Sequence, residues 1–202
     1  QIITHAARMK SRTLGKLSCP VVYRMPFGGG IQAPEHHSES TEAILAHIPG
    51  LIIKIPHTPE QAYHLMLESI ALPDPVIFLE PKRIYRYSFP KTEHPTKPVL
   101  IPATSVTHQG TNITIITWGA IHQDICELIQ DHPHLGIELI GLTSLKPIQY
   151  QPIFNSIHKT GRCLIIHEAV RFCGIGAEIA ATLNEQLFSI LLAPIMRLTA
   201  PN

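Results

Sequence analysis

The chain has 202 residues, of which 45% are hydrophobic and 15% charged, and 16 Lys and Arg against 15 Asp and Glu give a formal net charge of +1. This balance describes a globular chain and excludes a disordered one, and without a basic run there is no reason to expect a nucleic-acid partner. No apolar run approaches the ~20 residues that cross a bilayer, and no signal-peptide pattern is visible, so we expect no membrane association.

The first 86 residues alternate between predicted helices and strands. Residues 1–12 are typical of the end of a helix, because apolar residues recur among basic ones. A short helix with Ser40 as its N-cap follows, and a second helix starts in the capping box Thr58–Gln61. The predicted strands are 21–25, 51–55 and 76–79. This order is typical of an α/β fold with a mainly parallel sheet.

A proline-rich stretch separates this part from a second α/β series. Residues 87–102 carry four prolines among charged residues, which predicts a linker between a domain at 1–86 and another at 103–202. The second series has predicted strands at 114–118, 136–142 and 163–167, each followed by a helix, and Gly161 is the expected end of the second of these helices. The glycines at Gly174–Gly176 lack the rest of a nucleotide-binding fingerprint, so we interpret them as close packing of a helix on a strand.

The densest set of proton-handling groups follows the first predicted strand. Gly28–Gly30 end that strand, and His36, His37, Ser38 and Glu39 come soon after. Imidazole titrates near neutral pH, so a histidine on a loop after a strand is a candidate for proton transfer. The chain holds 13 histidines, and the alternative is that these two are ordinary surface residues.

Four cysteines, Cys19, Cys126, Cys163 and Cys173, fall at no metal-ligand spacing. We interpret them as reduced core residues of a compartment without disulfides. A zinc site assembled from distant histidines and cysteines is the alternative.

Seven strings taken together resemble one family. They are RMPFGGGIQAPEHHSES, AHIPGLIIKIPHTPEQA, DPVIFLEPKRIYR, ITWGAIHQD, KTGRCLIIHEA, GIGAEIAA and APIMRLTAPN. In this order they resemble the beta subunit of the thiamine-diphosphate-dependent 2-oxo acid dehydrogenase component. The form FLEPKRIYR is most similar to the branched-chain (2-oxoisovalerate) type, and the pyruvate and acetoin dehydrogenase beta subunits are close to it. The resemblance also implies that this chain lacks the N-terminal part of the family's first domain.

The resemblance carries expectations about fold, reaction and partners. It implies part of a pyrimidine-binding thiamine-diphosphate domain at 1–86, followed by a transketolase C-terminal-type α/β domain at 103–202. It implies oxidative decarboxylation of a branched-chain 2-oxo acid, with acyl transfer to the lipoyl group of a dihydrolipoyl acyltransferase. Thiamine diphosphate and magnesium would be shared with an alpha subunit, and a second beta subunit would be a further partner. The expected location is the cytoplasm of a bacterium or the mitochondrial matrix of a eukaryote.

One catalytic residue is implied. The family's histidine in an HS pair matches His37 with Ser38, and the resemblance makes it a hydrogen-bond donor and proton source near the substrate and the lipoyl arm. The family's glutamate that activates the cofactor lies upstream of Gln1. The glutamates Glu39, Glu42 and Glu80 do not match it, so we expect no cofactor-binding residue in this chain and no activity of the chain alone.

Many relatives also carry a structural potassium site made mainly of backbone carbonyls. Its matching positions here are Val21, Ser69, Ile70, Leu72 and Asp74. An aspartate is usual where Leu72 stands, and leucine offers only its carbonyl oxygen.

Two other functions remain open at this point. The chain from Ala103 onward could act as an assembly module, since the family's C-terminal domain forms the beta–beta contact and the docking surface for the acyltransferase. The chain could also come from another thiamine-dependent enzyme, such as a relative of transketolase or deoxyxylulose-phosphate synthase. Those enzymes carry both halves of the cofactor site on one chain, so a neighbouring alpha-subunit reading frame would argue against them.

Overall fold

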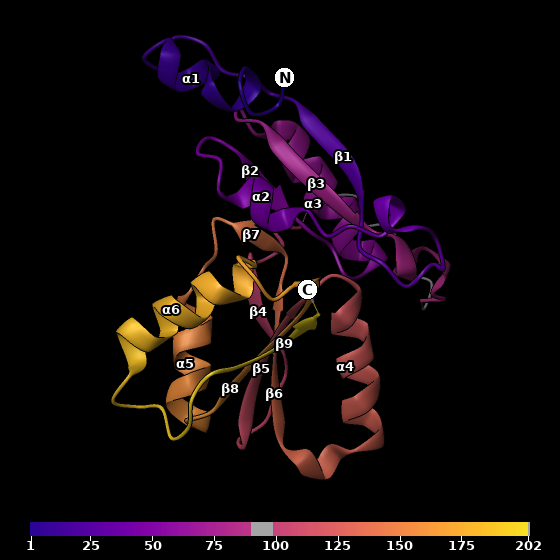
Figure 1. The fold of residues 1–202 in the computed structure, drawn as a ribbon, viewed down its shortest axis with the longest axis vertical. Helices are drawn as coiled ribbons and strands as arrows, with labels where there is room; N and C mark the ends of the chain where they lie inside the picture. The colour runs from indigo at the N-terminus through magenta and orange to yellow at the C-terminus, as the bar shows by residue number, and fades with distance from the viewer. Residues whose placement is uncertain (90–98, 202) are drawn as a thin grey trace.

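The computed structural model describes residues 1–89 and 99–201. Two sheets with helices packed against them make up the fold, and the two sheets lie one above the other in the view of Figure 1. Among the described residues, no helix is both long enough and apolar enough to pass through a membrane. The α/β architecture expected from the alternating pattern is confirmed.

The first sheet has the strand order β1-β3-β2-β7. β1 (Val22–Phe27), β2 (Ile52–Lys54) and β3 (Val76–Pro81) are parallel, while β7 (Ser144–Lys146) pairs antiparallel with β2. β3 lies between the other two parallel strands, and its first four residues are all apolar and buried, as a strand covered on both faces requires. β7 comes from the second half of the chain. The first sheet therefore contains strands from both sides of the predicted linker.

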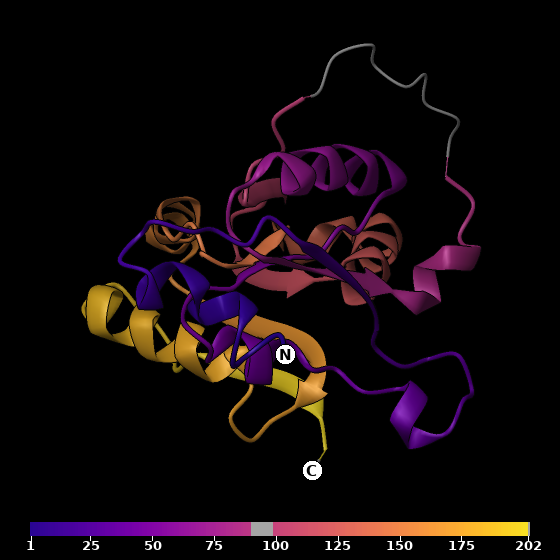
Figure 2. The ribbon, with the colours of Figure 1, turned by 90° about the horizontal axis from the view of Figure 1, so that it is seen from above.

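Helices cover this sheet on both sides (Figure 2). α3 (Pro59–Ala71) packs against β3, and the short α2 (Glu42–Ala46) packs against β2, β7 and α6. The segment before β1 forms η1 (Ala6–Arg8) and α1 (Met9–Arg12). Two short turns, η2 (Glu35–His37) and η3 (Lys82–Arg86), follow β1 and β3.

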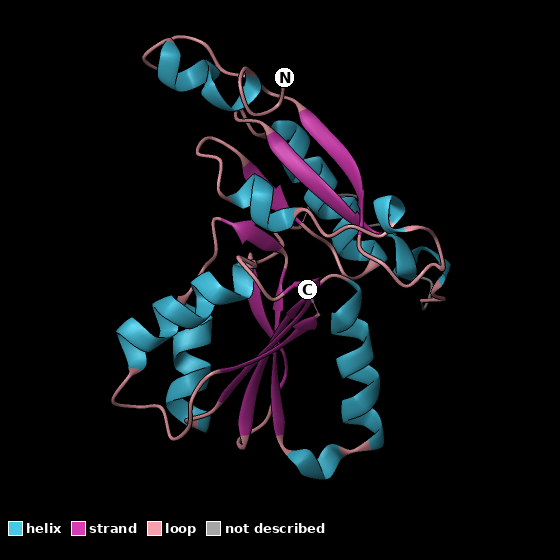
Figure 3. Ribbon diagram, viewed as in Figure 1, coloured by secondary structure: helices cyan, strands magenta, loops and turns pink. Residues whose placement is uncertain are grey.

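The second sheet has the order β4-β6-β5-β8-β9. β5 (Ile113–Trp118), β6 (Ile137–Leu142), β8 (Cys163–Val170) and β9 (Met196–Ala200) are parallel neighbours, and β4 (Thr104–His108) is antiparallel to β6. α4 (Ala120–Asp131) lies on one side of this sheet, and α5 (Gln151–Thr160) and α6 (Ile175–Leu187) lie on the other (Figure 3). The turn η4 (Pro133–Leu135) joins α4 to β6.

One large hydrophobic core joins the two halves of the chain. It contains Phe27 and Ile53 from the first sheet together with Ile116, Trp118 and Leu183 from the second half, all with less than 2% of their surface exposed. A smaller core lies under α4 and includes Ile125, Leu139 and Ile166. Because the larger core is shared, the two sheets are held in one arrangement, and side chains from both halves meet at a fixed seam.

Several local predictions can be compared with these elements. The capping box is confirmed: Thr58 is the N-cap of α3 and its hydroxyl accepts a bond from the Gln61 N–H at 3.2 Å. The Ser40 N-cap is wrong, since α2 begins at Glu42 after Thr41, and no side chain caps it. Close packing at the GxG is confirmed, because a Cβ added at Gly176 would lie 2.6 Å from His167 Nε2.

The cysteine and linker predictions have mixed outcomes. All four cysteines are free thiols, but only Cys163 is buried, and the prediction of a core position is wrong for the exposed Cys173. Residues 87–89 and 99–102 form no helix or strand, as a linker predicts. The other predicted linker residues, 90–98, lie outside the described part of the chain, and the domain limits stay a prediction.

Candidate active site

The carboxyl ends of strands from both sheets meet at one place. β1 ends at Phe27 and leads into the triple glycine, β3 leads into η3, and β5 and β8 bring Trp118 and Glu168 to the same seam. Ligands of parallel α/β folds bind outside the carboxyl ends of the strands. This seam is therefore the natural candidate for an active site.

A loop of residues 28–41 leaves β1 at this seam, and we call it the histidine loop. Gly28 and Gly30 both have φ of +79°, a conformation that other residues rarely adopt, so the glycines allow the sharp departure from β1. The Gly28 N–H donates to the Glu39 carbonyl at 3.1 Å, which closes the loop at its base. The loop is thus a compact excursion whose two ends lie side by side.

His37 lies at the outer part of this loop and is exposed to solvent. Its ring lies beside that of His36, with 4.0 Å between the centroids, and its backbone carbonyl accepts a bond from the Lys82 ammonium of η3. The Ser38 hydroxyl donates to the Ala33 carbonyl at 3.1 Å. The His37 imidazole is therefore accessible to a ligand, while its backbone is held by the neighbouring turn.

Glu168 of β8 packs directly against the start of the histidine loop. A Cβ added at Gly28 would lie only 2.0 Å from Glu168 Oε2, and the Gly29 N–H donates to the same carboxylate. The pairing of β8 with β9 is irregular between Ile166 and Val170, so Glu168 stands on a bulged segment. Burial raises the pKa of Glu168, and the nearby Arg83 opposes that effect.

Arg83 of η3 connects Glu168 to the second half of the fold. Its guanidinium lies 2.6 Å from Asp124 Oδ2 of α4 and 3.6 Å from Glu168 Oε1. Its aliphatic stem covers Gly30, where an added Cβ would lie 2.7 Å from Arg83 Cδ. Arg83 therefore touches the histidine loop and two carboxylates of the second half at once.

Glu42 is at the other end of the loop and is fully buried. Its Oε1 accepts a hydrogen bond from Trp118 Nε1 at 3.2 Å, while Oε2 has no partner among the described residues. Burial raises the pKa of Glu42 to about 7. Trp118 in turn stacks on His167, with 5.0 Å between ring centroids and 12° between planes, and burial lowers the pKa of His167 to about 4.

A second histidine pair lies deeper in the seam. The ring centroids of His57 and His122 are 3.9 Å apart, and both residues are 2% exposed. His122 Nδ1 is 2.8 Å from Thr117 Oγ1, and Gln123 donates to the His57 carbonyl at 2.6 Å. Burial lowers the pKa of both imidazoles, to about 4 for His122, so the pair is neutral at physiological pH. We interpret it as packing between the halves.

The residues matched to a potassium site gather at the amino ends of the strands, far from the histidine loop in the sheet. Val21 precedes β1, Ser69 and Ile70 lie in the last turn of α3, Leu72 is its C-cap, and Asp74 precedes β3. The Val21 carbonyl already accepts the Val76 N–H at 2.9 Å.

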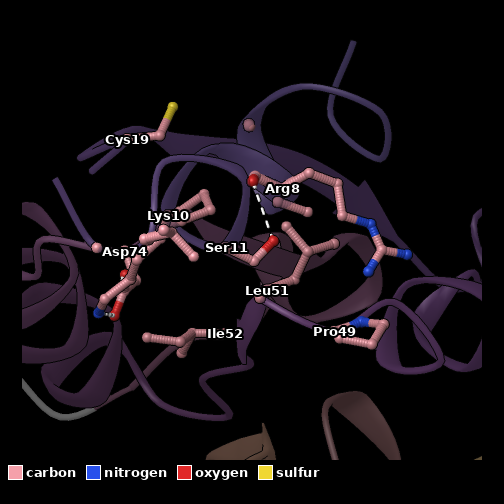
Figure 4. A pocket seen from close by; sticks show the side chains of 14 residues that line it. Arg8, Lys10, Ser11, Cys19, Pro49, Leu51, Ile52 and Asp74 are labelled. Carbon is pink, nitrogen blue, oxygen red and sulfur yellow. Dashed lines mark hydrogen bonds and ion pairs between the residues drawn. The ribbon is translucent and has the colours of Figure 1, made fainter. Parts of the chain in front are cut away.

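Asp74 is engaged by an ammonium group. Lys10 Nζ of α1 lies 2.9 Å from both Oδ1 and Oδ2 of Asp74, at the edge of a pocket of about 570 Å³ (Figure 4). Potassium prefers several free oxygen ligands, and the one carboxylate of this set is taken by Lys10. The potassium site stays a prediction, and the one carboxylate of its donor set is engaged by Lys10.

Two further observations bear on what this seam can bind. Within residues 1–89 and 99–201, no three His, Cys, Asp or Glu side chains are grouped to hold a metal ion. Glu42 is buried and bound to Trp118, and Glu80 binds Arg24 and Tyr85, so neither presents a free carboxylate to a cofactor.

The sequence pointed to His37 but missed the residues that hold its loop. Glu168, Arg83 and Trp118 lie in strings that carry the family resemblance, KTGRCLIIHEA, FLEPKRIYR and ITWGAIHQD. Their presence in those strings was the one signal that could have found them. Their roles were not visible, because they depend on contacts between segments 41 to 140 residues apart, among them Arg83 with Asp124 and Gly28 with Glu168.

Comparisons with known proteins agree with this architecture. Residues 2–88 match the family described as Transketolase, pyrimidine binding domain, and residues 103–202 match Transketolase, C-terminal domain. A solved structure, a split-gene transketolase described as an inactive beta4 tetramer, superposes with a TM-score of 0.70 at 18% identity over 98% of this chain and 65% of that one. This likeness shows the fold.

Curated relatives match along nearly the whole chain. The pyruvate dehydrogenase beta subunit of Acholeplasma laidlawii is 42% identical over 202 residues, covering 98% of this chain and 61% of the relative. The 3-methyl-2-oxobutanoate dehydrogenase beta subunit of Mycobacterium tuberculosis is 39% identical, covering 98% and 57%. The chain thus spans about three fifths of the length of these relatives. With two domains matched in the same order, the chain belongs to the transketolase-like family that joins a pyrimidine-binding domain to a transketolase C-terminal domain.

Proposed function

We propose that this chain is part of the beta subunit of a thiamine-diphosphate-dependent 2-oxo acid dehydrogenase. The single observation that carries the proposal is the exposed His37, presented on a closed loop at the carboxyl ends of the parallel strands. The relatives at 37–42% identity that are named as dehydrogenase beta subunits support the same class.

The chain's own contribution would be a proton donor at the entrance of the site. Thiamine diphosphate, when bound with an alpha subunit, supplies the nucleophilic carbon and the electron sink for loss of carbon dioxide. The His37 imidazole would donate a proton to the sulfur atom released when the lipoyl disulfide opens. An exposed imidazole suits this task, since it is accessible to a bound ligand and histidine is the side chain most often used for proton transfer.

The partners follow from the incomplete site. Among the described residues no three His, Cys, Asp or Glu side chains group for a metal ion, and Glu42 and Glu80 are engaged by Trp118, Arg24 and Tyr85. We therefore propose that an alpha subunit provides the diphosphate and magnesium side, and that a dihydrolipoyl acyltransferase receives the acyl group. The complex would work in the cytoplasm of a bacterium or the matrix of a mitochondrion.

The proposed substrate class is a short 2-oxo acid. The motif FLEPKRIYR favours the branched-chain type, while relatives named for pyruvate and for branched-chain substrates are comparably similar. Competition between pyruvate and 3-methyl-2-oxobutanoate in the assembled enzyme measures the preference directly, as the ratio of the two kcat/KM values.

The proposal is tested by His37→Ala in the full-length beta subunit assembled with its alpha subunit. Transfer of the acyl group to lipoamide should fall about 100-fold or more, a usual effect of losing a general acid. His36→Ala is the matched control, because His36 neighbours His37 and is also exposed. Unchanged turnover in His37→Ala would refute the role of His37.

A second candidate function is an assembly module, and exposed apolar side chains favour it. Phe172, Phe188, Met196 and Leu198 are 59–76% exposed, all in the second half of the chain. A pull-down with the peripheral binding domain of the acyltransferase tests docking by this half. Retention supports it, and no retention counts against it.

A further inference from the structure

The histidine loop is contacted at both of its ends by side chains from the second half of the chain. Glu168 lies against Gly28 and accepts the Gly29 N–H, and Trp118 donates to Glu42, the residue after the loop. These two contacts come from neighbouring strands, β8 and β5, which pair in parallel. A rigid sheet thus meets both ends of a short loop.

We propose that Glu168 and Trp118 are positioning residues that hold the histidine loop from the second sheet and so set the place of His37. Neither residue needs to touch a substrate for this role. The effect of this positioning on catalysis rests on the proposed function of His37. The claim that Glu168 and Trp118 hold the loop in place does not depend on that function.

The start of the loop is in close contact with Glu168 at Gly28. The distance of 2.0 Å from a Gly28 Cβ to Glu168 Oε2 means that only glycine permits the carboxylate to lie there. The Glu168 side chain is 14% exposed and also faces Arg83, whose stem covers Gly30. Glu168 and Arg83 therefore enclose two of the three glycines.

The contact at the other end is equally specific. Glu42 is 0% exposed, and Trp118 Nε1 is the side-chain donor to its carboxyl group. Trp118 is itself 1% exposed and stacked on His167, so the donor has little freedom to move. Fixing both ends matters because a loop held only at one end would let His37 sample many positions.

Between these ends the loop is contacted from η3, where the Lys82 ammonium donates to the His37 carbonyl and the Arg83 stem lies against Gly30. His36 and His37 are exposed, and η2 spans only three residues, Glu35–His37. Since most of its surface faces solvent, we expect its order to depend on the anchors at Gly28, Gly29 and Glu42.

The first experiment is amide deuterium exchange on the chain, on three variants of the anchoring residues and on one control variant. Glu168→Ala removes the acceptor for Gly29, and Trp118→Phe removes the indole N–H together with part of the ring volume while keeping one aromatic ring. In both, amides in residues 28–41 should exchange about 10-fold faster, and amides of α4 and α5 should be unchanged. The conservative Glu168→Gln keeps an acceptor oxygen and should restore most of the protection.

The control is Glu185→Ala, an exposed glutamate on α6, which should leave exchange in the loop as in the parent. Parental exchange in residues 28–41 for either Glu168→Ala or Trp118→Phe overturns the proposal. Faster exchange throughout the chain would assign the residues to general stability and would overturn it equally.

The second experiment uses the full-length subunit assembled with its alpha subunit. Glu168→Ala should lower kcat for acyl transfer about 10-fold with little change in KM for the 2-oxo acid, and Glu168→Gln should recover most of that loss. If His37→Ala leaves turnover unchanged, the proposed catalytic role of His37 is refuted. The deuterium-exchange result then still shows whether Glu168 and Trp118 hold the loop. If His37→Ala is impaired but Glu168→Ala is not, the positioning role fails alone.

Discussion

Trp118 Nε1 of β5 donates a hydrogen bond to Glu42 Oε1 of α2 at 3.2 Å, and this contact joins two residues that are 76 positions apart in the chain. Both residues are buried, and the second carboxyl oxygen of Glu42 has no partner among the described residues. A carboxylate in this position would carry a poorly compensated charge inside the seam. The protonated form is therefore favoured in the folded protein.

The first prediction concerns the pH dependence of this carboxyl group. Burial raises the pKa of Glu42 from 4.5 to about 7, so between these pH values the folded chain holds a proton that the unfolded chain has released. The free energy of unfolding contributed by Glu42 therefore falls as pH rises, by at most about 1.4 kcal/mol per pH unit. Glu42→Gln lacks this loss and still accepts the Trp118 bond.

Urea unfolding of Glu42→Gln and the parent at pH 5, 6 and 7 measures the effect. The stability of the variant relative to the parent should increase steadily across this range. A constant difference between the two proteins would show that Glu42 titrates normally. Glu185→Gln, at an exposed position, should give a difference that does not change with pH.

The second prediction has the opposite sign and concerns His122. Burial lowers the pKa of His122 from 6.5 to about 4, so between these values the unfolded chain binds the additional proton. The unfolding free energy from this group is fully present above pH 6.5 and is lost as pH falls toward 4. The neighbouring His57 is affected in the same direction by burial and by His122.

His122→Gln removes the titration and can still bond to the Thr117 hydroxyl. The parent should therefore lose stability relative to His122→Gln as pH falls from 6.5 to 4, by at most about 1.4 kcal/mol per pH unit. The exposed His108 provides the control variant, His108→Gln. Parallel stability curves for the parent and His122→Gln would contradict the prediction.

Sequence patterns predicted the ends of helices correctly where neighbouring residues determine those ends. The Thr58 N-cap with Pro59 after it fixed the start of α3, and Gly161, with φ of +66°, ends α5 as expected. The strands β4, β7 and β9 were not predicted, because each is short and mixes polar with apolar residues, so that only its pairing with a distant strand makes it a strand.

The residues of the candidate site also fall into those that the sequence predicted and those that only the structure identifies. His37 was found from its type and from the family resemblance, both of which depend on one segment of sequence. Glu168 and Trp118 gain their roles only when β8 and β5 meet the loop after β1, a contact that no periodicity encodes. The Ser40 cap was misplaced because α2 begins at Glu42 after Thr41 without a hydrogen bond from any capping side chain, so the capping pattern had no counterpart in the structure.

The third prediction is that the chain by itself binds thiamine diphosphate weakly or not at all. The described residues lack a metal cluster, and Glu42 and Glu80 are engaged by Trp118, Arg24 and Tyr85. Isothermal calorimetry with thiamine diphosphate and magnesium should show no binding at micromolar concentrations. The full-length subunit with its alpha subunit is the positive control, and tight binding by the chain alone would contradict the prediction.

The fourth prediction is that folding of this chain does not depend on potassium. The Lys10 ammonium lies 2.9 Å from both carboxylate oxygens of Asp74, and leucine at position 72 contributes no side-chain oxygen. The thermal unfolding temperature should therefore be the same in potassium and sodium chloride at equal ionic strength. A specific increase in potassium would mean that the ion displaces Lys10.

Lys10→Met distinguishes neutralisation of the Asp74 carboxylate by the Lys10 ammonium from neutralisation by a potassium ion. Since the side chains are 56% and 29% exposed, the ion pair stabilises the fold by about 0.2–1 kcal/mol, and the variant should lose that amount. If the ammonium stands in for a cation, the variant should regain stability in potassium chloride but not in choline chloride, whose cation is too large for the carboxylate and carbonyls. Lys16→Met, at an exposed position six residues away, should respond equally to both salts. An identical response of Lys10→Met and Lys16→Met would show that Asp74 needs no neutralising cation at all.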